Sequence, residues 1–249
     1  MLHKILSRTL FILWLSGSMA IAQEKVLYND SVLRTEILAQ LKPFLDVERS
    51  PTRQLSLRKF AKLRATIHRA ILRTYKPYSM LQNTLAEGTF DCVTGSLVYA
   101  TVLDYYAIPY DIVETDRHVF LLVQFKQPVL LEATDPTAGG LVVGEAAVTA
   151  KYHTYIEKYG SRVSAATTSF VEENVSQHNE RVISLTELYG LTYYNAALLA
   201  YYYDMSAHIA LKQLDKAQNF YACHRISTFR ALIEDSTTYR QVALPQYYQ

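Results

Sequence analysis

The sequence predicts an α+β fold in which a cysteine-bearing helix packs on an antiparallel sheet. Residues 93–106 place apolar side chains at helical spacing. Three short runs rich in Val, Ile, Leu and Phe follow, at 110–115, 118–125 and 129–134. The joints between these runs are short and turn-like, which favours antiparallel strands. Helical segments are expected before and after this core.

The first 22 residues are typical of a secretory signal. Basic residues precede the apolar run at 10–15, and Ala20-Ile21-Ala22 fits a cleavage site before Gln23. The apolar run is shorter than the ~20 residues that a membrane span requires. We therefore expect an exported protein, periplasmic or extracellular after cleavage, that does not span a membrane.

The charge of the chain excludes no partner by itself but gives no support for nucleic acid. The 249 residues include 25 basic and 23 acidic side chains, and loss of Lys4 and Arg8 with the signal balances the two signs. Residues 49–86 carry nine basic and no acidic side chains. This block indicates either an anion-binding face or a solvated face paired with acids elsewhere in the fold.

Four regions are expected along the chain. Residues 1–22 form the signal, 23–77 the N-terminal helices, 78–160 the core, and 161–249 a mostly helical C-terminal region. The N-terminal region contains one amphipathic pattern at 31–46. A second helix is expected to begin at Ser50-Pro51, run to about Tyr75 and stop at Pro77.

The C-terminal region is expected to add helices to this core. Helical patterns occupy 145–159 and 185–233, on either side of a polar stretch at 160–181. Part of the second pattern has the spacing of a tetratricopeptide hairpin, at Tyr201, Ala210, Leu214 and Ala217. A single unit cannot form the array that such repeats need. We therefore expect one helical hairpin packed beside the core.

Cys92 occupies the point where a loop turns into an apolar helix, in the stretch GTFDCVTGSLVYATVL at 88–103. Backbone N–H groups at a helix start stabilise an anion by about 0.3–1 kcal/mol. The thiolate is the nucleophilic form of cysteine, which makes Cys92 a candidate nucleophile. In an exported chain it is alternatively half of a disulfide with Cys223, or a buried inert thiol.

A cysteine nucleophile needs a base, and the base needs an orienting acceptor. His118 begins a predicted strand, and Asp135 ends the strand expected to pair with it across a short hairpin. Glu132 and Asp116 are further candidates for the acceptor. An Asp-Pro turn is the structural alternative for Asp135.

Four features in this order resemble the transglutaminase-like superfamily, which has a papain-like core. They are Asp91-Cys92 at a helix start, Ile108-Pro109 at its exit, a strand-initial His118, and Asp135-Pro136-Thr137 closing the next strand. The resemblance covers about residues 78–145. It implies acyl transfer from amides, with Cys92 as nucleophile, His118 as base and Asp135 as the residue that orients the base.

This sequence departs from the family pattern at two places. Val119-Phe120 follows the histidine where many members have a tryptophan. Members also use an upstream glutamine in the oxyanion hole, and Gln82 is the nearby candidate here. The backbone N–H of Cys92 can supply one oxyanion donor without it.

The sequence supports two hypotheses of different classes. The first is an exported cysteine-dependent enzyme that hydrolyses or transamidates a peptide, protein or cell-envelope amide. The second is a non-catalytic protein that binds a peptide, glycan or protein partner, in which the tyrosines at 189–203 line a groove instead of packing in the core. The histidines lack the spacing of a metal site, so neither a metal nor a cofactor is expected.

Overall fold

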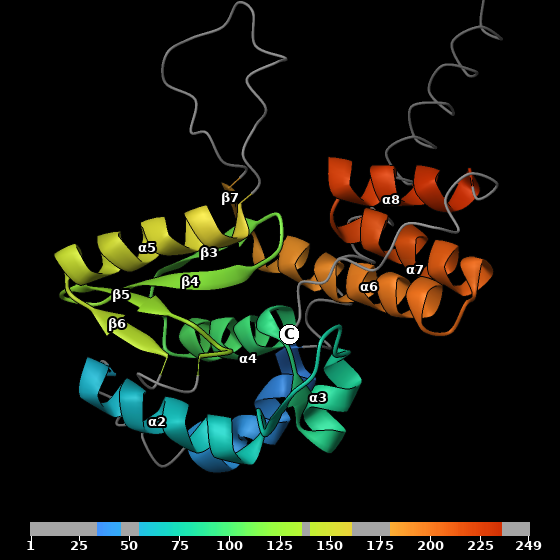
Figure 1. Cartoon of the computed structure of the whole chain (residues 1–249). Coiled ribbons are helices and arrows are strands. Elements are labelled where there is room, and N and C mark those ends of the chain that lie inside the picture. The colour runs from blue at the N-terminus through green and yellow to red at the C-terminus, as the bar shows by residue number, and fades with distance from the viewer. Residues whose placement is uncertain (1–33, 46–54, 136–139, 161–179, 236–249) are drawn as a thin grey trace, which may run out of the picture. The chain divides into compact units, whose positions relative to one another are not determined.

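The computed structural model of the chain describes residues 34–45, 55–135, 140–160 and 180–235 (Figure 1). The chain divides into two units, Met1–Gln40 and Leu41–Gln249. A helix over residues 34–45 crosses that boundary, and every other element belongs to the second unit. The predicted signal at 1–22 lies outside the described residues, and so does Ser50-Pro51. The helix expected to begin there begins instead at Leu57, because Leu55 and Ser56 are not helical.

Between residue 55 and the central helix, the structure describes two helices. α2 (Leu57–Ala70) begins after Ser56, whose hydroxyl accepts a hydrogen bond from the Lys59 N–H. α3 (Leu81–Glu87) ends at Gly88, whose φ of 72° is in the left-handed region that favours glycine.

The helix predicted to run to Tyr75 ends at Ala70, so this prediction was wrong. Thr74–Tyr75 instead forms β1, which pairs in parallel with β2 (Thr89–Phe90). The carbonyl of Gly88 accepts hydrogen bonds from the N–H groups of Arg73 (2.8 Å) and Thr74 (3.0 Å). Hydrogen bonds to Gly88 and pairing with β2 therefore hold this segment in an extended conformation, and the helix ends before Pro77.

α4 (Cys92–Tyr105) is the central helix and lies where the sequence predicts one. The Asp91 carboxylate accepts from the Thr94 N–H at 2.9 Å, and the Thr94 hydroxyl accepts from the Asp91 N–H at 3.1 Å. This reciprocal capping box fixes the start of the helix. Every side chain from Val93 to Leu103 is buried, as expected for a helix enclosed on all sides. Cys92 is therefore held at the first helical position of a buried helix.

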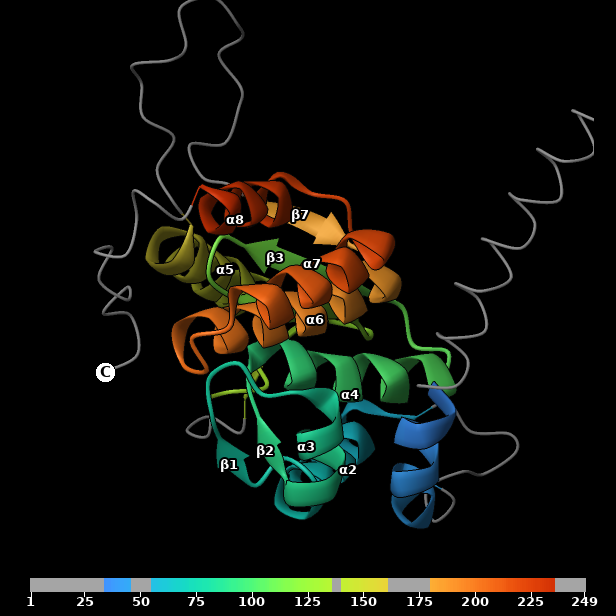
Figure 2. The same ribbon diagram turned by 90° about the vertical axis from the view of Figure 1, so that its right-hand side faces the viewer.

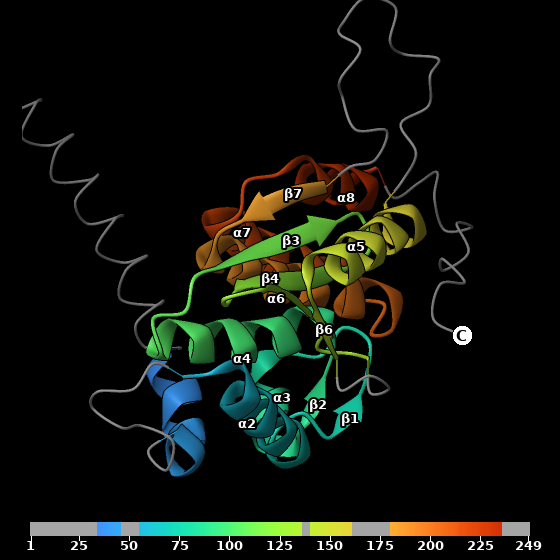
Figure 3. The same cartoon turned by 90° about the vertical axis from the view of Figure 1, so that its left-hand side faces the viewer.

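The sheet is antiparallel, with the strand order β6-β5-β4-β3-β7 (Figure 3). Its strands are β3 (Tyr110–Thr115), β4 (Val119–Gln124), β5 (Pro128–Leu131), β6 (Leu141–Val143) and β7 (Glu180–Ile183). The first three were predicted. β7 was not predicted, because it is a short run at the end of the polar stretch and pairs with β3, which lies far away in the sequence. The sheet thus extends past residue 160.

Helices cover both faces of the sheet, α5 (Glu145–Tyr159) on one and α4 on the other (Figure 1). On the α5 side, strand and helix residues share a buried cluster of Val113, Phe120, Leu130, Val148, Tyr155 and Ile156. This arrangement confirms the predicted α+β class with an antiparallel sheet.

Three further helices complete the described part of the chain. They are α6 (Leu185–Tyr202), α7 (Ala207–Phe220) and α8 (His224–Glu234). α6 and α7 form a hairpin (Figure 2), and α6 also packs against α4. A Cβ added at Gly190 of α6 would lie 2.8 Å from the Cβ of Tyr221, so the two sides of the hairpin approach closely. Within the described ranges, no helix combines the length and apolar character needed to cross a bilayer.

Gly95 lets α4 approach the end of β5 closely. A Cβ at this position would lie 2.7 Å from the Cβ of Ala133 and 3.2 Å from the ring of Phe90. Alanine normally stabilises a helix by about 1 kcal/mol relative to glycine, but the overlap is expected to reverse that sign. We expect Gly95→Ala to lower the free energy of unfolding in urea by about 1–3 kcal/mol.

The control for Gly95→Ala is the double variant that also carries Ala133→Gly. It removes the methyl group that the new side chain meets, so it should recover part of the lost stability. A Gly95→Ala protein as stable as the wild type would contradict the close approach.

Candidate active site

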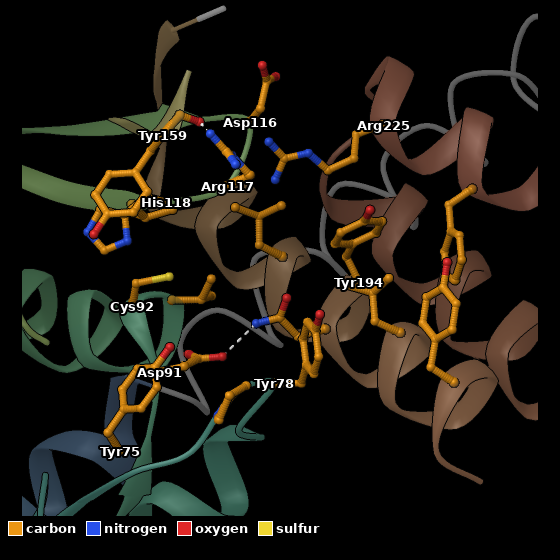
Figure 4. A pocket seen from close by; sticks show the side chains of 18 of the residues that line it. Tyr75, Tyr78, Asp91, Cys92, Asp116, Arg117, His118, Tyr159, Tyr194 and Arg225 are labelled. Atoms are coloured by element: carbon orange, nitrogen blue, oxygen red, sulfur yellow. Dashed lines mark hydrogen bonds between the residues drawn. The ribbon is translucent and has the colours of Figure 1, made fainter. Parts of the chain in front are cut away.

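A cavity of about 430 Å³ opens beside the start of α4 (Figure 4). Its wall also includes the turn between β3 and β4, the end of α5, and parts of α6 and α8. Tyr75 and Tyr78 close the side next to Asp91 (Figure 4). The cavity therefore collects segments that lie far apart in the sequence around Cys92.

The structure brings Cys92 and His118 together in the wall of this cavity. Figure 4 shows the thiol and the imidazole on the same side, with the sulfur directed toward the cavity. His118 is 7% exposed, and Cys92 is half-buried. Both Cys92 and Cys223 are free thiols, so the disulfide alternative is not formed. The cysteine and its candidate base thus lie close together, as the nucleophile hypothesis requires.

Glu132 holds the imidazole of His118 in place. Its Oε2 lies 2.5 Å from Nε2 of His118. Its Oε1 accepts hydrogen bonds from the N–H of Thr134 at 2.8 Å and from the hydroxyl of the same residue at 2.7 Å. Both carboxylate oxygens are therefore fixed, and the carboxylate is 3% exposed. Because Nε2 faces Glu132, Nδ1 is the ring nitrogen left for the thiol.

The expectation that Asp135 orients His118 is corrected by this geometry. β4 and β5 pair with Leu122 opposite Leu130. Continued toward the strand ends, this register sets His118 opposite Thr134, and alternation of side chains gives Glu132 the same face as His118. The same alternation assigns Asp135 to the opposite face. Its Oδ2 lies 4.0 Å from the Nζ of Lys151. Glu132 therefore replaces Asp135 as the candidate for the orienting role.

The pair of His118 and Glu132 favours its charged form. Burial acts to lower the pKa of His118, but the charge of Glu132 and hydrogen bonding with Cys92 and Glu132 outweigh it and hold this pKa well above its usual value. Burial likewise acts to raise the pKa of Glu132, but the charge and hydrogen bond of His118 and the bonds from Thr134 keep it lowered. Both shifts favour an imidazolium beside a carboxylate.

These two shifts predict a pH window for stability. A raised histidine pKa stabilises the fold fully below the unfolded value of about 6.5, and this contribution is lost as the pH rises through the folded value. A lowered glutamate pKa contributes above about 4.3, and this contribution is lost as the pH falls through the folded value. We expect the stability difference between the wild type and a His118→Gln/Glu132→Gln variant to be greatest between about pH 4.3 and 6.5.

Urea unfolding of both proteins at pH 5.5 and at pH 9 measures that difference. Comparing the two proteins at each pH removes the contribution of other titrating groups. An equal difference at both pH values would show that the pair does not titrate with folding.

Two tyrosines of α5 pack on the imidazole, a feature that the sequence did not reveal. The ring of Tyr159 stacks on His118 with centroids 4.4 Å apart, and Tyr155 meets it edge-on at 5.7 Å. Arg117 donates to the Lys158 carbonyl at 2.7 Å and so ties the end of α5 to the residue before His118. An aromatic face stabilises a nearby cation, so Tyr159 favours the imidazolium.

A buried polar pair joins α6 to the start of α4. The amide of Asn195 donates to Oδ2 of Asp91 at 2.7 Å, and both residues line the cavity next to Cys92. Burial raises the pKa of Asp91 to about 6, although hydrogen bonds from Thr94, Val93 and Asn195 oppose this effect. The carboxyl group next to the candidate nucleophile therefore has a pKa closer to neutral pH than that of an exposed aspartate.

The far side of the cavity is anchored by Arg225 of α8. Its guanidinium donates to the Thr115 carbonyl at 2.6 Å and lies 3.0 Å from Oε1 of the buried Glu114. Arg181 of β7 pairs with the other oxygen of Glu114 at 2.8 Å. These contacts fix α8 and β7 to the end of β3. The buried carboxylate of Glu114 is therefore paired with two guanidinium groups.

The remaining expectations concern oxyanion donors and metals. Gln82 is exposed on α3 and does not line the cavity, so it does not serve as a donor near Cys92. Asp116 lines the cavity beside Arg117 (Figure 4). In the part of the chain that the structure describes, no group of three or more His, Cys, Asp or Glu side chains is placed to hold a metal ion.

Comparison with known proteins gives no assignment for this arrangement. The chain matches no family model, no curated protein and no solved structure.

Proposed function

We propose that the protein is an exported cysteine-dependent enzyme that transfers acyl groups from amide bonds. The observation that carries the proposal is that Cys92 and His118 share the wall of one cavity, with the buried Glu132 bonded to the far ring nitrogen of His118. Nucleophile, base and orienting acceptor in hydrogen-bonding sequence are what such chemistry requires. The order of these residues and a cysteine-bearing helix packed on an antiparallel sheet also support a transglutaminase-like, papain-like enzyme.

In the first half of the reaction, the sulfur of Cys92 attacks the carbonyl carbon of the amide. A tetrahedral intermediate forms, and we expect the backbone N–H of Cys92 to donate to its oxyanion. The imidazolium of His118 then gives its proton to the amide nitrogen. The C–N bond breaks, the amine leaves, and a thioester on Cys92 remains with a neutral imidazole.

In the second half, the neutral imidazole of His118 accepts a proton from water or from an amine. The activated water or amine attacks the thioester carbon, and the C–S bond breaks. The products are a carboxylic acid or a new amide, together with the regenerated thiolate and imidazolium. The carboxylate of Glu132 stabilises the charged ring at the beginning and end of this cycle.

The electrostatics of the site favour an enzyme over a protein that only binds. The pKa of the buried His118 is raised well above its usual value, so the fold keeps a charged ring away from water. Losing the hydration of this charge is unfavourable, and a groove that only binds a partner does not require it. An imidazolium next to a cysteine, by contrast, is the proton donor that the leaving amine needs.

Trapping the thioester tests the proposal. The wild-type protein is incubated with a pool of peptidyl aminomethylcoumarin amides, and the reaction is quenched in acid. The protein is then digested, and the mass of the peptide that contains Cys92 is measured by mass spectrometry. We expect an acyl mass on this peptide that neutral hydroxylamine removes, together with release of fluorophore. Absence of both with every substrate would reject an acyl-transfer enzyme and favour the binding protein.

Adding a primary amine to the same reaction distinguishes the two outcomes of the second half. A transamidase is expected to convert the acyl group into the new amide in proportion to the amine. A hydrolase is expected to release the acid at an unchanged rate.

A further inference from the structure

We propose that this enzyme selects amides whose acyl part carries an aromatic or large aliphatic side chain. The inference rests on the proposed function and concerns the same cavity. It follows from the chemical difference between the two ends of the cavity, and from the direction in which the scissile amide must lie between them.

One end of the cavity is polar and contains the imidazole. Figure 4 shows His118, Tyr159 and Arg117 at this end, together with Asp116 at the turn between β3 and β4. Lys158 lines the cavity there as well. Charged side chains therefore surround the place where the proton donor lies.

The wall built by α6 and α8 is largely apolar and aromatic. Leu191, Tyr194, Leu198 and Tyr202 from α6 and Phe229 from α8 form this apolar part, and Asn195 and Arg225 are the polar residues that these helices add to the lining. The ring of Phe229 packs edge-on against Tyr194 with centroids 5.8 Å apart and stacks on Tyr202 at 5.9 Å. Phe229 is itself 6% exposed, so this wall is supported by packing and exists before a ligand enters. Tyr194 lies across the cavity from Cys92 in Figure 4.

The reaction fixes which end receives which half of the substrate. The amide nitrogen must face the N–H of His118, because this ring donates the proton to the leaving amine. The carbonyl carbon sits at the sulfur of Cys92, and the acyl substituent then points away from the imidazole. The acyl side chain is thereby directed to the wall formed by α6 and α8, whereas the amine half faces the charged end.

The volume of the cavity fits this assignment. About 430 Å³ is within the range of pockets that enclose one small ligand, so it holds the scissile amide and one large side chain. Removing a large apolar side chain from water is favourable, and one methylene group in such a pocket changes kcat/KM by about 10- to 200-fold. An acyl residue with a charged end would lose its hydration against these rings, and the neighbouring Arg225 is already paired with Glu114 and the Thr115 carbonyl.

The test compares dipeptide amides that share one leaving group and differ only in the acyl residue. We expect kcat/KM to be roughly 100-fold higher for phenylalanine or leucine than for glycine, with glutamate no better than glycine. Leu198→Trp fills the apolar end and should lower kcat/KM for the phenylalanine substrate by about 10-fold or more while sparing the glycine substrate. Ile209→Trp, at a 46% exposed position of α7 outside the cavity, is the matched control and should leave both values unchanged.

Leu198→Ala covers the case in which the tryptophan variant does not fold, as judged by circular dichroism. It enlarges the pocket and should reduce the preference for phenylalanine over glycine. Turnover with a flat or reversed acyl preference, or an unchanged preference in both Leu198 variants, would overturn this inference and leave the enzyme in place. No turnover of any substrate and no acyl mass on Cys92 would overturn the proposed function and the inference with it.

Discussion

Glu132→Gln is expected to lower kcat/KM for amide substrates by about 10²- to 10⁴-fold, whereas Asp135→Asn changes it by less than about threefold. Glutamine keeps the size of the side chain but removes the charge that lies 2.5 Å from Nε2 of His118. Burial then acts on the imidazole without compensation and lowers its pKa. At neutral pH the ring loses its proton, and the leaving amine loses its donor.

The comparison of the two carboxylates identifies the orienting residue without depending on fold stability alone. Both substitutions remove one negative charge at nearby positions of the same hairpin segment. Kinetics are measured from pH 5 to 9 on proteins whose urea unfolding confirms that they are folded. A large loss for Asp135→Asn with a small one for Glu132→Gln would return the role to Asp135 and contradict the geometry.

Cys92→Ser is expected to eliminate measurable thioester formation and to lower turnover by at least about 10³-fold. A hydroxyl at this position matches the thiol in shape but is a weaker nucleophile than sulfur, so attack on the carbonyl carbon slows. Cys223→Ser is the matched control, because Cys223 is also a half-buried free thiol and lies at the start of a helix. It should keep full activity. Loss of activity in the control, or its retention in Cys92→Ser, would place the nucleophile elsewhere.

Local signals in the sequence predict the central part of the fold well. The apolar runs separated by short polar joints correspond to β3, β4 and β5, and the apolar helix after Asp91 corresponds to α4. These elements depend on alternation, helical spacing and a capping residue, all of which involve neighbours in the chain. Cys92 and His118 could be proposed for the same reason, because each lies at the end of such an element.

The parts that the sequence did not predict depend on contacts between distant residues. β1 and β7 are short, and each exists because it pairs with a strand elsewhere in the chain. Glu132 was one of three candidate acceptors, and only the hairpin register separates it from Asp135. The ring of Tyr159 and the amide of Asn195 reach the site from α5 and α6, and no local pattern indicates where those helices pack.

In the proposed mechanism, the thiol of Cys92 is activated by His118, which the buried carboxylate of Glu132 keeps charged. The rate at which iodoacetamide alkylates Cys92 at pH 6 tests it most directly, in a Cys223→Ser background that leaves a single cysteine. An unperturbed thiol, with a pKa of about 8.5, is almost entirely protonated at this pH. We predict alkylation about 10- to 100-fold faster than that of free cysteine, and loss of this advantage in His118→Ala. Alkylation at the rate of free cysteine, unchanged by His118→Ala, would contradict the account.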